Sequence, residues 1–462
     1  MLRRFFTLFL SLSLLGGCGS YLPSKVPFVQ QKQEDEDVRI SREFRREAKK
    51  KLKLIHHLEV ERYVDQIGQR IISVMGPQPF DYRFFVVENS QMNAFAVPGG
   101  SIYVYSGLIE RVKTTDELAG VIGHEIIHVK SRHAARISGP DPTSLLVLLG
   151  IFLARGGSQA QAAGALGGAL AATRQLSYNR QLEQEADTLG VKYMAEAGYD
   201  PRGALRFLKI IDQERTLNPV DIPSYLMTHP LTQERIAGVE TAIRTLRLER
   251  PKLEHPDPIK KVQTILRLER QDSDAVIAEN ERLLGQYPGS AEPMHLLGVA
   301  HHNKGRWSET RENYERTRTL NPKSPGIDRD LGRLYTQIGE FRLAHEAFER
   351  SLSFEPREPL NHLFLGELFE KESNLREAVG AYLRAHNLSP LWAEPPHRLG
   401  IVYGKMNRLG DAYYYLARSH LLSDEDEKAI ADLERALKIL DPASPRGQVV
   451  KDELEAIKAR RR

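Results

Sequence analysis

The apolar positions in the first part of the chain follow a helical period. From Arg39 to Met75, apolar residues recur at the spacing of one helix face, which predicts a long helix with a break near His56 and His57. The residues before it, 18–37, are polar and rich in Gln, Glu and Asp, and they predict an extended tether.

Strand-like runs interrupt this helical pattern. Three short segments rich in aromatic and β-branched residues, 80–88, 93–97 and 101–105, predict strands. Pro98 has no N–H to donate to a strand ladder, so the middle segment is expected at an edge or next to a turn. An edge strand is also a template on which an extended peptide can pair.

A buried helix is expected from Thr114 to Ile137. Thr114 can cap it, Glu117 can close a capping box, and the Ser-Gly-Pro of 138–140 ends it. Further helices are predicted over 176–197, over 203–216 and from Thr232 onward.

The second half of the chain repeats every 34 residues. A proline, a Leu-Gly pair, an aromatic or leucine position and a small position keep this spacing. The positions are Pro288, Pro322, Pro356 and Pro390; Gly298, Gly332, Gly366 and Gly400; Tyr314, Phe348, Tyr382 and Leu416; and Thr310, Ala344, Ala378 and Ala412. This period is typical of tetratricopeptide repeats, which are helix pairs that stack into a solenoid. A last helix over about 424–440 is expected to cap the array.

Composition narrows the classes of function. A chain of 462 residues is too long for one core, and a formal net charge of +4 is small for that length, so there is no case for nucleic-acid binding. Hydrophobic residues at 41% and charged residues at 27% are ordinary for a soluble protein. The single cysteine, Cys18, excludes an intrachain disulfide and a multi-thiolate metal site.

The first residues predict an export signal. Arg3 and Arg4 precede an apolar run, 5–15, that is too short to span a bilayer. The small residues before Cys18 resemble a bacterial lipobox, which implies cleavage before that cysteine and its lipidation. Gly19 after the cysteine implies, by the same resemblance, the outer membrane. The alternative is an ordinary cleaved signal with an incidental cysteine, and in either case the mature protein is exported.

A second apolar run, 144–154, is also too short to cross a membrane. A buried helix or an interfacial loop is favoured over a span. Because the run lies between segments that carry candidate metal ligands, it could cover the cleft as a lid.

The chemistry is concentrated in His124-Glu125-Ile126-Ile127-His128, an HExxH motif inside the buried helix. Two histidines four residues apart project from one helix face, so both imidazoles can reach a single zinc ion. Glu125 is placed to accept a proton from water activated there. The alternative is a pair of core histidines, but the apolar flanks make uncompensated histidines costly.

A catalytic zinc site needs three protein ligands, and the two histidines of the motif supply only two of them. The best candidate is Glu183 in the stretch 182–187, LEQEAD. Asp187 lies one helical turn further and suits a partner that orients a ligand histidine. Glu185 lies about 200° round the helix from Glu183, so both cannot face the metal.

At this point a family resemblance is clear. HExxH followed by Glu183-x-x-x-Asp187 resembles the zinc metallopeptidases that include the CAAX prenyl proteases and HtpX. The repeats and the export signal are more similar to a periplasmic branch of them, the β-barrel assembly-enhancing proteases, over nearly the whole mature chain. The resemblance implies one Zn²⁺ per chain bound by His124, His128 and Glu183, with Glu125 as the base.

The same resemblance brings in further residues. The stretch 93–100 is similar to the family's substrate-side strand, which implies that Asn93, Ala94, Phe95 and Ala96 hold substrate. Residues 228–235 are similar to another family motif, in which His229 approaches the metal and Arg235 supports the ligands. His229 then either holds the site shut as an extra ligand or stabilises the oxyanion. The alternative is a loop histidine with a structural hydrogen bond. His133 also lies in a similar stretch, but it is off the ligand face and is expected to be structural.

The expected architecture is mainly α: a zincin-like α+β metallopeptidase domain with a small β-sheet, followed by an α-solenoid. Its segments are a lipoprotein-type signal peptide (1–17), a tether (18–37), the peptidase domain (38–250), a linker (251–260), the repeats (261–445) and a basic, solvated C-terminal tail (446–462).

Two functions are compatible with these features, and the expected one is zinc-dependent cleavage of misfolded or misassembled envelope proteins. In the first, the repeats recruit substrate or the outer-membrane assembly machinery, and the protein is periplasmic and anchored to the outer membrane through lipidated Cys18. In the second, the chain is a chaperone or scaffold whose peptidase site is latched or vestigial. Neither involves nucleic acid.

Overall fold

The computed structural model describes residues 28–138, 180–217, 223–246, 257–270 and 272–460. The predicted signal peptide, Cys18 and the apolar run 144–154 lie outside these residues, as do most of the predicted linker and the first part of the tether.

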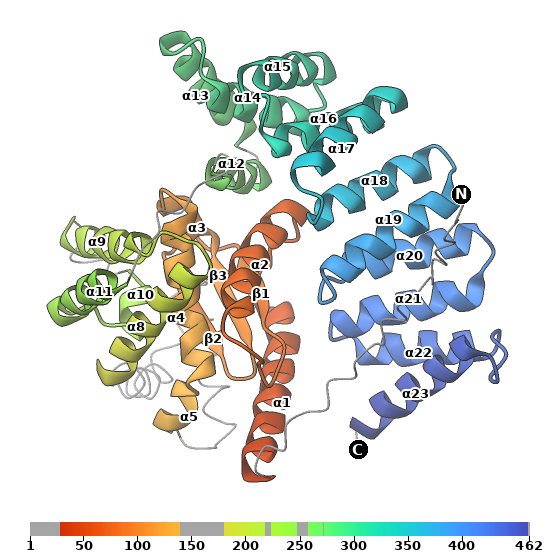
Figure 1. Cartoon of the computed structure of the whole chain (residues 1–462), viewed down its shortest axis with the longest axis horizontal. Coiled ribbons are helices and arrows are strands. Elements are labelled where there is room, and N and C mark those ends of the chain that lie inside the picture. Colours follow the sequence, from red (N-terminus) through yellow and green to blue (C-terminus); the bar gives the residue numbers. More distant parts are fainter. Residues whose placement is uncertain (1–27, 139–179, 218–222, 247–256, 271, 461–462) are drawn as a thin grey trace, which may run out of the picture.

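The N-terminal part surrounds a small sheet with helices (Figure 1). Its elements are α1 (Phe28–Lys51), α2 (Leu58–Ser73), β1 (Arg83–Val87), β2 (Ala94–Val97), β3 (Ser101–Tyr105), α3 (Ser106–Arg111), α4 (Thr115–Lys130), α5 (His133–Ser138), α8 (Arg180–Glu196), α9 (Arg202–Leu217), α10 (Tyr225–Thr228) and α11 (Gln233–Thr245).

The C-terminal part is helical throughout its described residues. Its elements are α12 (Ile259–Glu269), α13 (Ser273–Gln286), α14 (Ala291–Asn303), α15 (Trp307–Leu320), α16 (Pro325–Ile338), α17 (Phe341–Phe354), α18 (Pro359–Lys371), α19 (Leu375–Leu388), α20 (Glu394–Lys405), α21 (Leu409–Leu422), α22 (Asp426–Leu437) and α23 (Pro445–Arg460).

The sheet has the order β1-β3-β2, with β1 parallel and β2 antiparallel to β3. β2 is therefore an edge strand, as its neighbouring proline predicts. Helix α1 covers one face through Phe44, whose ring lies 5.4 Å from that of Tyr103. The opposite face, with Phe84 and Ile102, belongs to the main core together with α2 and α4. The sheet is thus buried on both faces, and α4 packs on the face opposite α1.

Helix α4 is shorter than predicted. Thr114 Oγ1 accepts from the N–H of Glu117 as expected, and the Glu117 carboxylate accepts from the N–H of Lys113. The helix ends at Lys130 rather than at Ile137, because Arg132 adopts a φ of 52° and turns the chain before α5. Sequence reasoning missed this break because neither Gly nor Pro marks it.

Two terminal predictions were wrong. The predicted tether is helical from Phe28, since α1 begins there. The predicted solvated tail forms α23, because Val450, Leu454 and Ile457 recur at helical spacing and are buried. Charged residues between these three positions concealed the amphipathic pattern.

The predicted repeat register is confirmed by close packing between paired helices. A Cβ added to Gly298 would lie 2.5 Å from the ring of Tyr314, and one added to Gly366 would lie 2.4 Å from that of Tyr382. The Leu-Gly glycines therefore let the aromatic residue of the following helix lie against the backbone. This explains why the two registers recur together.

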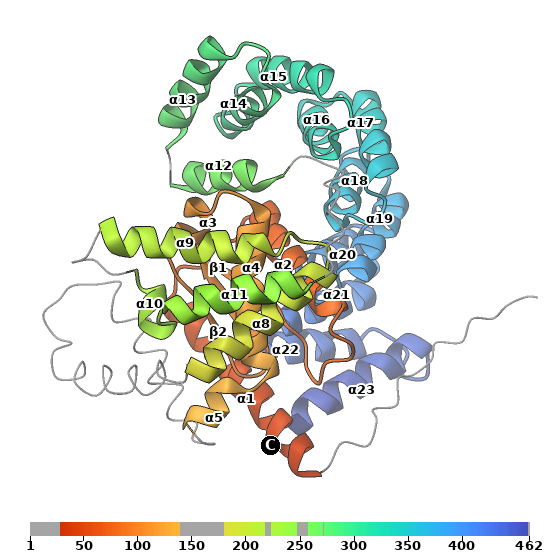
Figure 2. The same cartoon turned by 60° about the vertical axis from the view of Figure 1, so that its left-hand side comes forward.

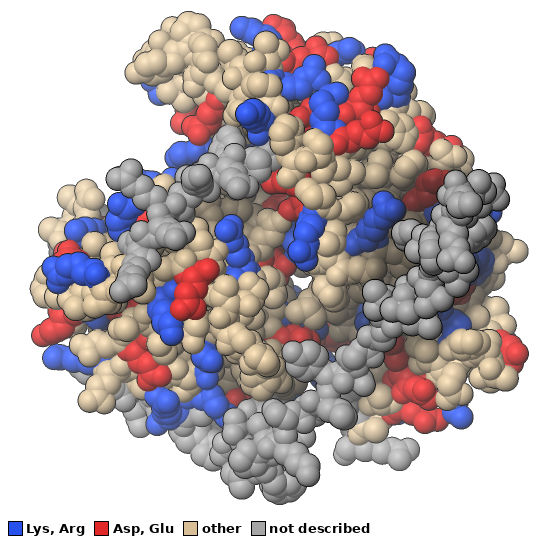
Figure 3. Space-filling view, viewed as in Figure 1, with Lys and Arg blue, Asp and Glu red and all other residues tan. Residues whose placement is uncertain are grey.

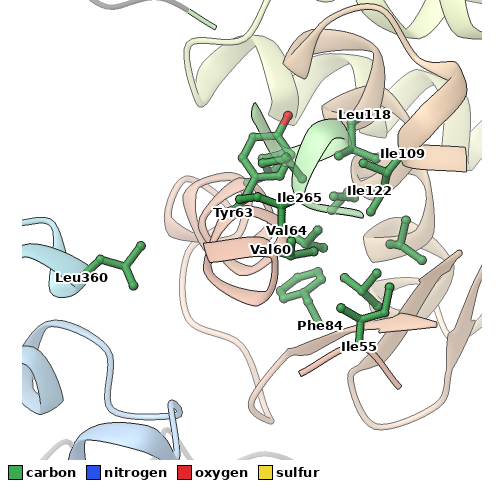
Figure 4. Packing of buried hydrophobic residues seen from close by; sticks show 14 of the residues in the cluster. Ile55, Val60, Tyr63, Val64, Phe84, Ile109, Leu118, Ile122, Ile265 and Leu360 are labelled. Carbon is green, nitrogen blue, oxygen red and sulfur yellow. The ribbon is translucent and has the colours of Figure 1, made fainter. Parts of the chain in front are cut away.

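The repeats begin on the core of the N-terminal part. Ile265 of α12 lies among Tyr63, Ile109 and Leu118 (Figure 4). The Gln263 side chain donates to the carbonyls of Ile109 and Val112, which close the end of α3. The first repeat helix is thus fixed to the N-terminal part rather than linked loosely to it.

The array then curves so that its inner face lies against α1 and α2 (Figure 2). Lys261 of α12, at the start of the array, and Arg333 of α16, further along it, both pair with Glu59 of α2. Near the end of the array, Asp424 pairs with Arg45 of α1. Part of the inner face of the array is therefore in contact with the chain's own N-terminal helices.

The surface in Figure 3 has Lys and Arg interspersed with Asp and Glu, in line with the small net charge. Within the described residues, no helix combines the length and apolar character that crossing a bilayer requires.

Candidate metal centre

Helices α4 and α8 bring three predicted ligands together. His124 and His128 point from one face of α4, and Glu183 faces them from α8. The two Nε2 atoms are 2.9 Å apart, and the Glu183 oxygens lie 3.4 Å from His124 Nε2 and 3.3 Å from His128 Nε2. The two helices can approach this closely because Gly190 of α8 has no side chain. A Cβ at this position would lie only 3.1 Å from the backbone nitrogen of His124.

His229 completes the group. It follows α10, and its Nδ1 lies 3.3 Å from His124 Nε2 and 3.2 Å from Glu183 Oε1. The candidate ligand atoms of these residues and His128 all lie within 4.8 Å of one another. Four candidate donors therefore converge, one more than the three protein ligands of a catalytic zinc site.

Glu125, next to His124 on α4, has a carboxylate in an environment without hydrogen-bond partners among the described residues. Its side chain is buried, and neither carboxylate oxygen has a hydrogen-bond partner among the described residues. His229 Nε2 lies 3.3 Å from its Oε1. Burial raises the pKa of Glu125 to about 7. A carboxyl with this pKa can accept and release a proton near neutral pH.

Asp187 and Arg235 hold the ligands in place. Asp187 Oδ1 lies 2.9 Å from His124 Nδ1. Arg235 donates to both Asp187 oxygens at 2.7 and 2.8 Å, and its Nη1 lies 3.0 Å from Glu183 Oε2. Burial would raise the pKa of Asp187, but the Arg235 charge outweighs it and sets the pKa at about 2. The predicted supporting pair is thus brought to the ligands.

The ionisation of the ligands suits a cation. Burial opposes a negative Glu183, yet the surrounding histidines keep its pKa well below the usual range. Burial lowers the pKa of His128 and of His229, which favours neutral imidazoles at these two positions. Burial also opposes a charge on His124, but its contacts with Asp187 and Glu183 raise its pKa to about 9, so these two carboxylates favour a positive charge there. Imidazoles and a carboxylate, beside a carboxylate without a hydrogen-bond partner among the described residues, are the donor set of a catalytic zinc site. The residues present therefore fit a divalent metal.

The edge strand β2 packs against α4, which carries two of these residues, and no strand of the described residues pairs with its outer edge. The Tyr105 N–H donates to Asn93 O, so the residues in step with Asn93 bond inward to β3. The backbone groups of Ala94 and Ala96 alternate with them and face away from β3. Of the predicted substrate residues, Ala94 and Ala96 thus turn their backbone groups toward the outer edge of the strand, where Ala96 is half-buried and Ala94 is buried, whereas Asn93 and Phe95 bond inward.

Sequence reasoning missed contacts that hold the His229 loop. The Tyr225 ring stacks on His229 with ring centroids 4.6 Å apart. The Tyr225 N–H and the Ser224 hydroxyl both donate to Met92 O, immediately before the predicted substrate stretch. The spacing of four between Tyr225 and His229 is one helical turn, which is the signal that could have shown the stacking.

Comparison with known proteins divides the chain in the same way. Residues 59–243 match the model of peptidase family M48, and residues 329–390 match a tetratricopeptide repeat model. Residues 378–441, which lie within the helical array, also match the Est1 DNA/RNA binding domain model. The chain thus contains an M48 peptidase domain followed by tetratricopeptide-like repeats.

Among curated proteins, the chain is 36% identical over 202 residues to the β-barrel assembly-enhancing protease of Escherichia coli (strain K12), covering 42% of this chain and 41% of that protein. It is 33% identical over 211 residues to the protein of that name from Yersinia pestis, covering 44% and 43%. It is 30% identical over 184 residues to the mitochondrial metalloendopeptidase OMA1 of Schizosaccharomyces pombe, covering 38% and 51%. The alignments span about two fifths to one half of these relatives.

Among solved structures, the chain is similar to MamA, with 20% identity and a TM-score of 0.32 over 35% of this chain and 94% of that one. It is also similar to PilW, a type IV pilus biogenesis factor, with 16% identity and a TM-score of 0.34 over 42% and 96%.

Proposed function

We propose that this chain is a zinc-dependent endopeptidase that cleaves misfolded or misassembled proteins of the bacterial cell envelope. One observation carries the proposal: two imidazoles and a carboxylate from distant segments converge beside Glu125, a buried carboxylate with no hydrogen-bond partner among the described residues. Structural zinc sites have no use for such a group, whereas peptide hydrolysis requires a base there.

The residues divide the chemistry between them. When bound, the metal supplies a Lewis acid that polarises a carbonyl and lowers the pKa of water. Glu125 accepts the proton of the attacking water and passes it to the leaving amine, so the peptide C–N bond breaks without release of a charged amide. His124, His128 and Glu183 hold the ion, and Asp187 and Arg235 keep His124 and Glu183 oriented.

The edge of β2 supports an extended peptide as substrate. The backbone groups of Ala94 and Ala96 face away from β3, and the half-buried Ala96 is where an added strand would first pair. An unfolded or misassembled protein exposes backbone that can pair there, whereas a folded one does not. The names of the bacterial relatives, the predicted export signal and Cys18 support a periplasmic site of action with an anchor in the outer membrane.

His229 supports a site that is closed at rest. Its Nδ1 lies within 4.8 Å of the ligand atoms of the other three residues, so it would compete with water for an ion held there, and its Nε2 lies 3.3 Å from Glu125 Oε1. Tyr225 stacks on it and is hydrogen-bonded to Met92, so leaving the site requires the α10 segment to move away from β2. The rest state is then a latched peptidase that opens when this segment is displaced.

Replacing His229 with Ala is therefore expected to raise proteolysis severalfold, because the blocking donor is removed and the other three ligands remain. The measurement is casein cleavage by the purified chain loaded with zinc. His397→Ala, which removes an exposed histidine of α20, is the matched control and should leave the rate unchanged. Lost activity with zinc retained would instead assign His229 to the transition state, and no cleavage by either chain would contradict the peptidase.

The alternative function is a scaffold whose peptidase stays latched. The four converging donors favour it, because a site with four protein ligands is closed in the manner of a structural zinc site. In that case removal of His229 releases no activity, and the effects of the protein in cells do not depend on Glu125.

A further inference from the structure

The turn after α4 brings a fourth histidine, His133, next to the three histidines of the metal group. Arg132 has a φ of 52°, so His133 at the start of α5 folds back toward the helix it follows. The rings of His133 and His128 have centroids 4.8 Å apart at 84°, and their Nδ1 atoms lie 2.9 Å from each other. His133 is buried. On a helix that continued to Ile137, His133 would lie off the face that carries the ligands. The turn at Arg132 changes its direction.

The direction of this hydrogen bond follows from counting protons. His128 turns its Nε2 toward the other ligands, so a neutral His128 bound through Nε2 carries its single proton on Nδ1. That proton points at His133 Nδ1, which must then accept it. The proton of His133 consequently lies on Nε2, which is buried 3.5 Å from Glu185 Oε2 and forms no hydrogen bond to a described residue. One arrangement thus fixes the tautomer of both rings.

Glu185 is itself held on the side away from the metal. Ser131 donates its hydroxyl to Oε1 at 2.7 Å, and Arg136 donates to Oε2 at 3.0 Å. Both donors belong to the turn and the short helix around His133. The carboxylate therefore ties α8 to α5 across the histidine that it faces.

We propose that His133 is a positioning residue for His128, and that Glu185 anchors it. This inference rests on the proposed function, in which His128 is a metal ligand. Alternate residues of α8 then serve different histidines: Glu183 joins the ligands, Asp187 orients His124 directly, and Glu185 orients His128 through His133. Partners of this kind keep a ligand ring in the orientation that binds the ion.

The test uses two substitutions of equal size in the full chain. His133→Asn places an amide oxygen near the position of Nδ1 and can accept the His128 proton, whereas His133→Leu cannot. We expect His133→Leu to weaken zinc binding by about 10–100-fold, measured by competition with a chromogenic chelator, and His133→Asn to restore most of the affinity. The kcat for casein should fall in His133→Leu with little change in KM, since substrate does not touch this residue.

Thermal unfolding of the metal-free chains separates positioning from folding. If His133→Leu does not fold, Glu185→Ala removes the half-buried anchor instead and should weaken zinc binding in the same direction. Equal zinc affinity in wild type and in the folded variants would overturn this inference and leave the proposed function standing. A wild-type chain that binds no zinc would overturn the proposed function, and this inference with it.

Discussion

Replacing Glu125 with Gln is expected to lower casein cleavage by about 10²–10⁴-fold, the usual contribution of a general base. The amide keeps the shape of the side chain but cannot accept the proton of the attacking water. Glu125 is buried and lies outside the group of four donors, so its loss leaves the ligands in place. The measurement is kcat for the zinc-loaded chain, compared in the wild-type and in the His229→Ala background.

The pH dependence of activity is a second test of Glu125 as the base. Burial raises the pKa of Glu125 to about 7, and a bound cation would favour the charged form and lower that value. The base must be deprotonated, so activity should rise with pH along an acid limb at or below about 7. Zinc content and thermal stability of Glu125→Gln serve as controls. A variant that retains wild-type kcat would show that Glu125 is not the base.

Replacing Arg45 with Ala is expected to lower the free energy of unfolding by about 3–5 kcal/mol, the usual cost of leaving a buried charge without its partner. Arg45 donates to both Asp424 oxygens at 2.7 Å, and its exposed fraction is 8%. It also donates to Ser41 and Ser101, at the start of β3. The loss therefore loosens the end of the repeat array from α1.

The matched control is Arg39→Ala on the same helix. Arg39 pairs with Glu36 and Glu43 but is 53% exposed, so its removal should cost no more than about 1 kcal/mol. Denaturant unfolding measures both variants, and limited proteolysis should cut within α21–α23 sooner in Arg45→Ala. Equal stability of the two variants would contradict a repeat array that is closed on the peptidase domain.

The metal group could be predicted because its geometry is local. The spacing of four in HExxH fixes one helix face, and the spacing of four from Glu183 to Asp187 fixes another. The repeats could be predicted for the same reason, since the glycine position of Gly298 and the aromatic position of Tyr314 recur together along the array. In each case the sequence carries the period of the structure that it forms.

Other features depend on contacts that no local pattern records. Arg45 and Asp424 are separated by 379 positions, and each reads alone as an ordinary surface charge. The approach of His133 depends on the φ of Arg132, a residue type that does not mark a turn. The contacts between the repeat array and helices α1 and α2 were likewise missed, because a repeat sequence does not show which other parts of the chain pack against it.

The central claim is that His124, His128 and Glu183 bind one catalytic zinc ion. It is tested most directly by metal analysis of the purified chain beside His229→Ala and Glu183→Ala/His229→Ala, with casein cleavage measured on the same samples, because His229 could replace Glu183 as the third ligand in a single variant. We predict one zinc per wild-type and per His229→Ala chain, loss of cleavage when a chelator removes it, recovery when zinc is returned, and neither stable zinc nor cleavage in a folded Glu183→Ala/His229→Ala. Full cleavage by the metal-free chain, or stoichiometric zinc in Glu183→Ala/His229→Ala, would contradict the claim.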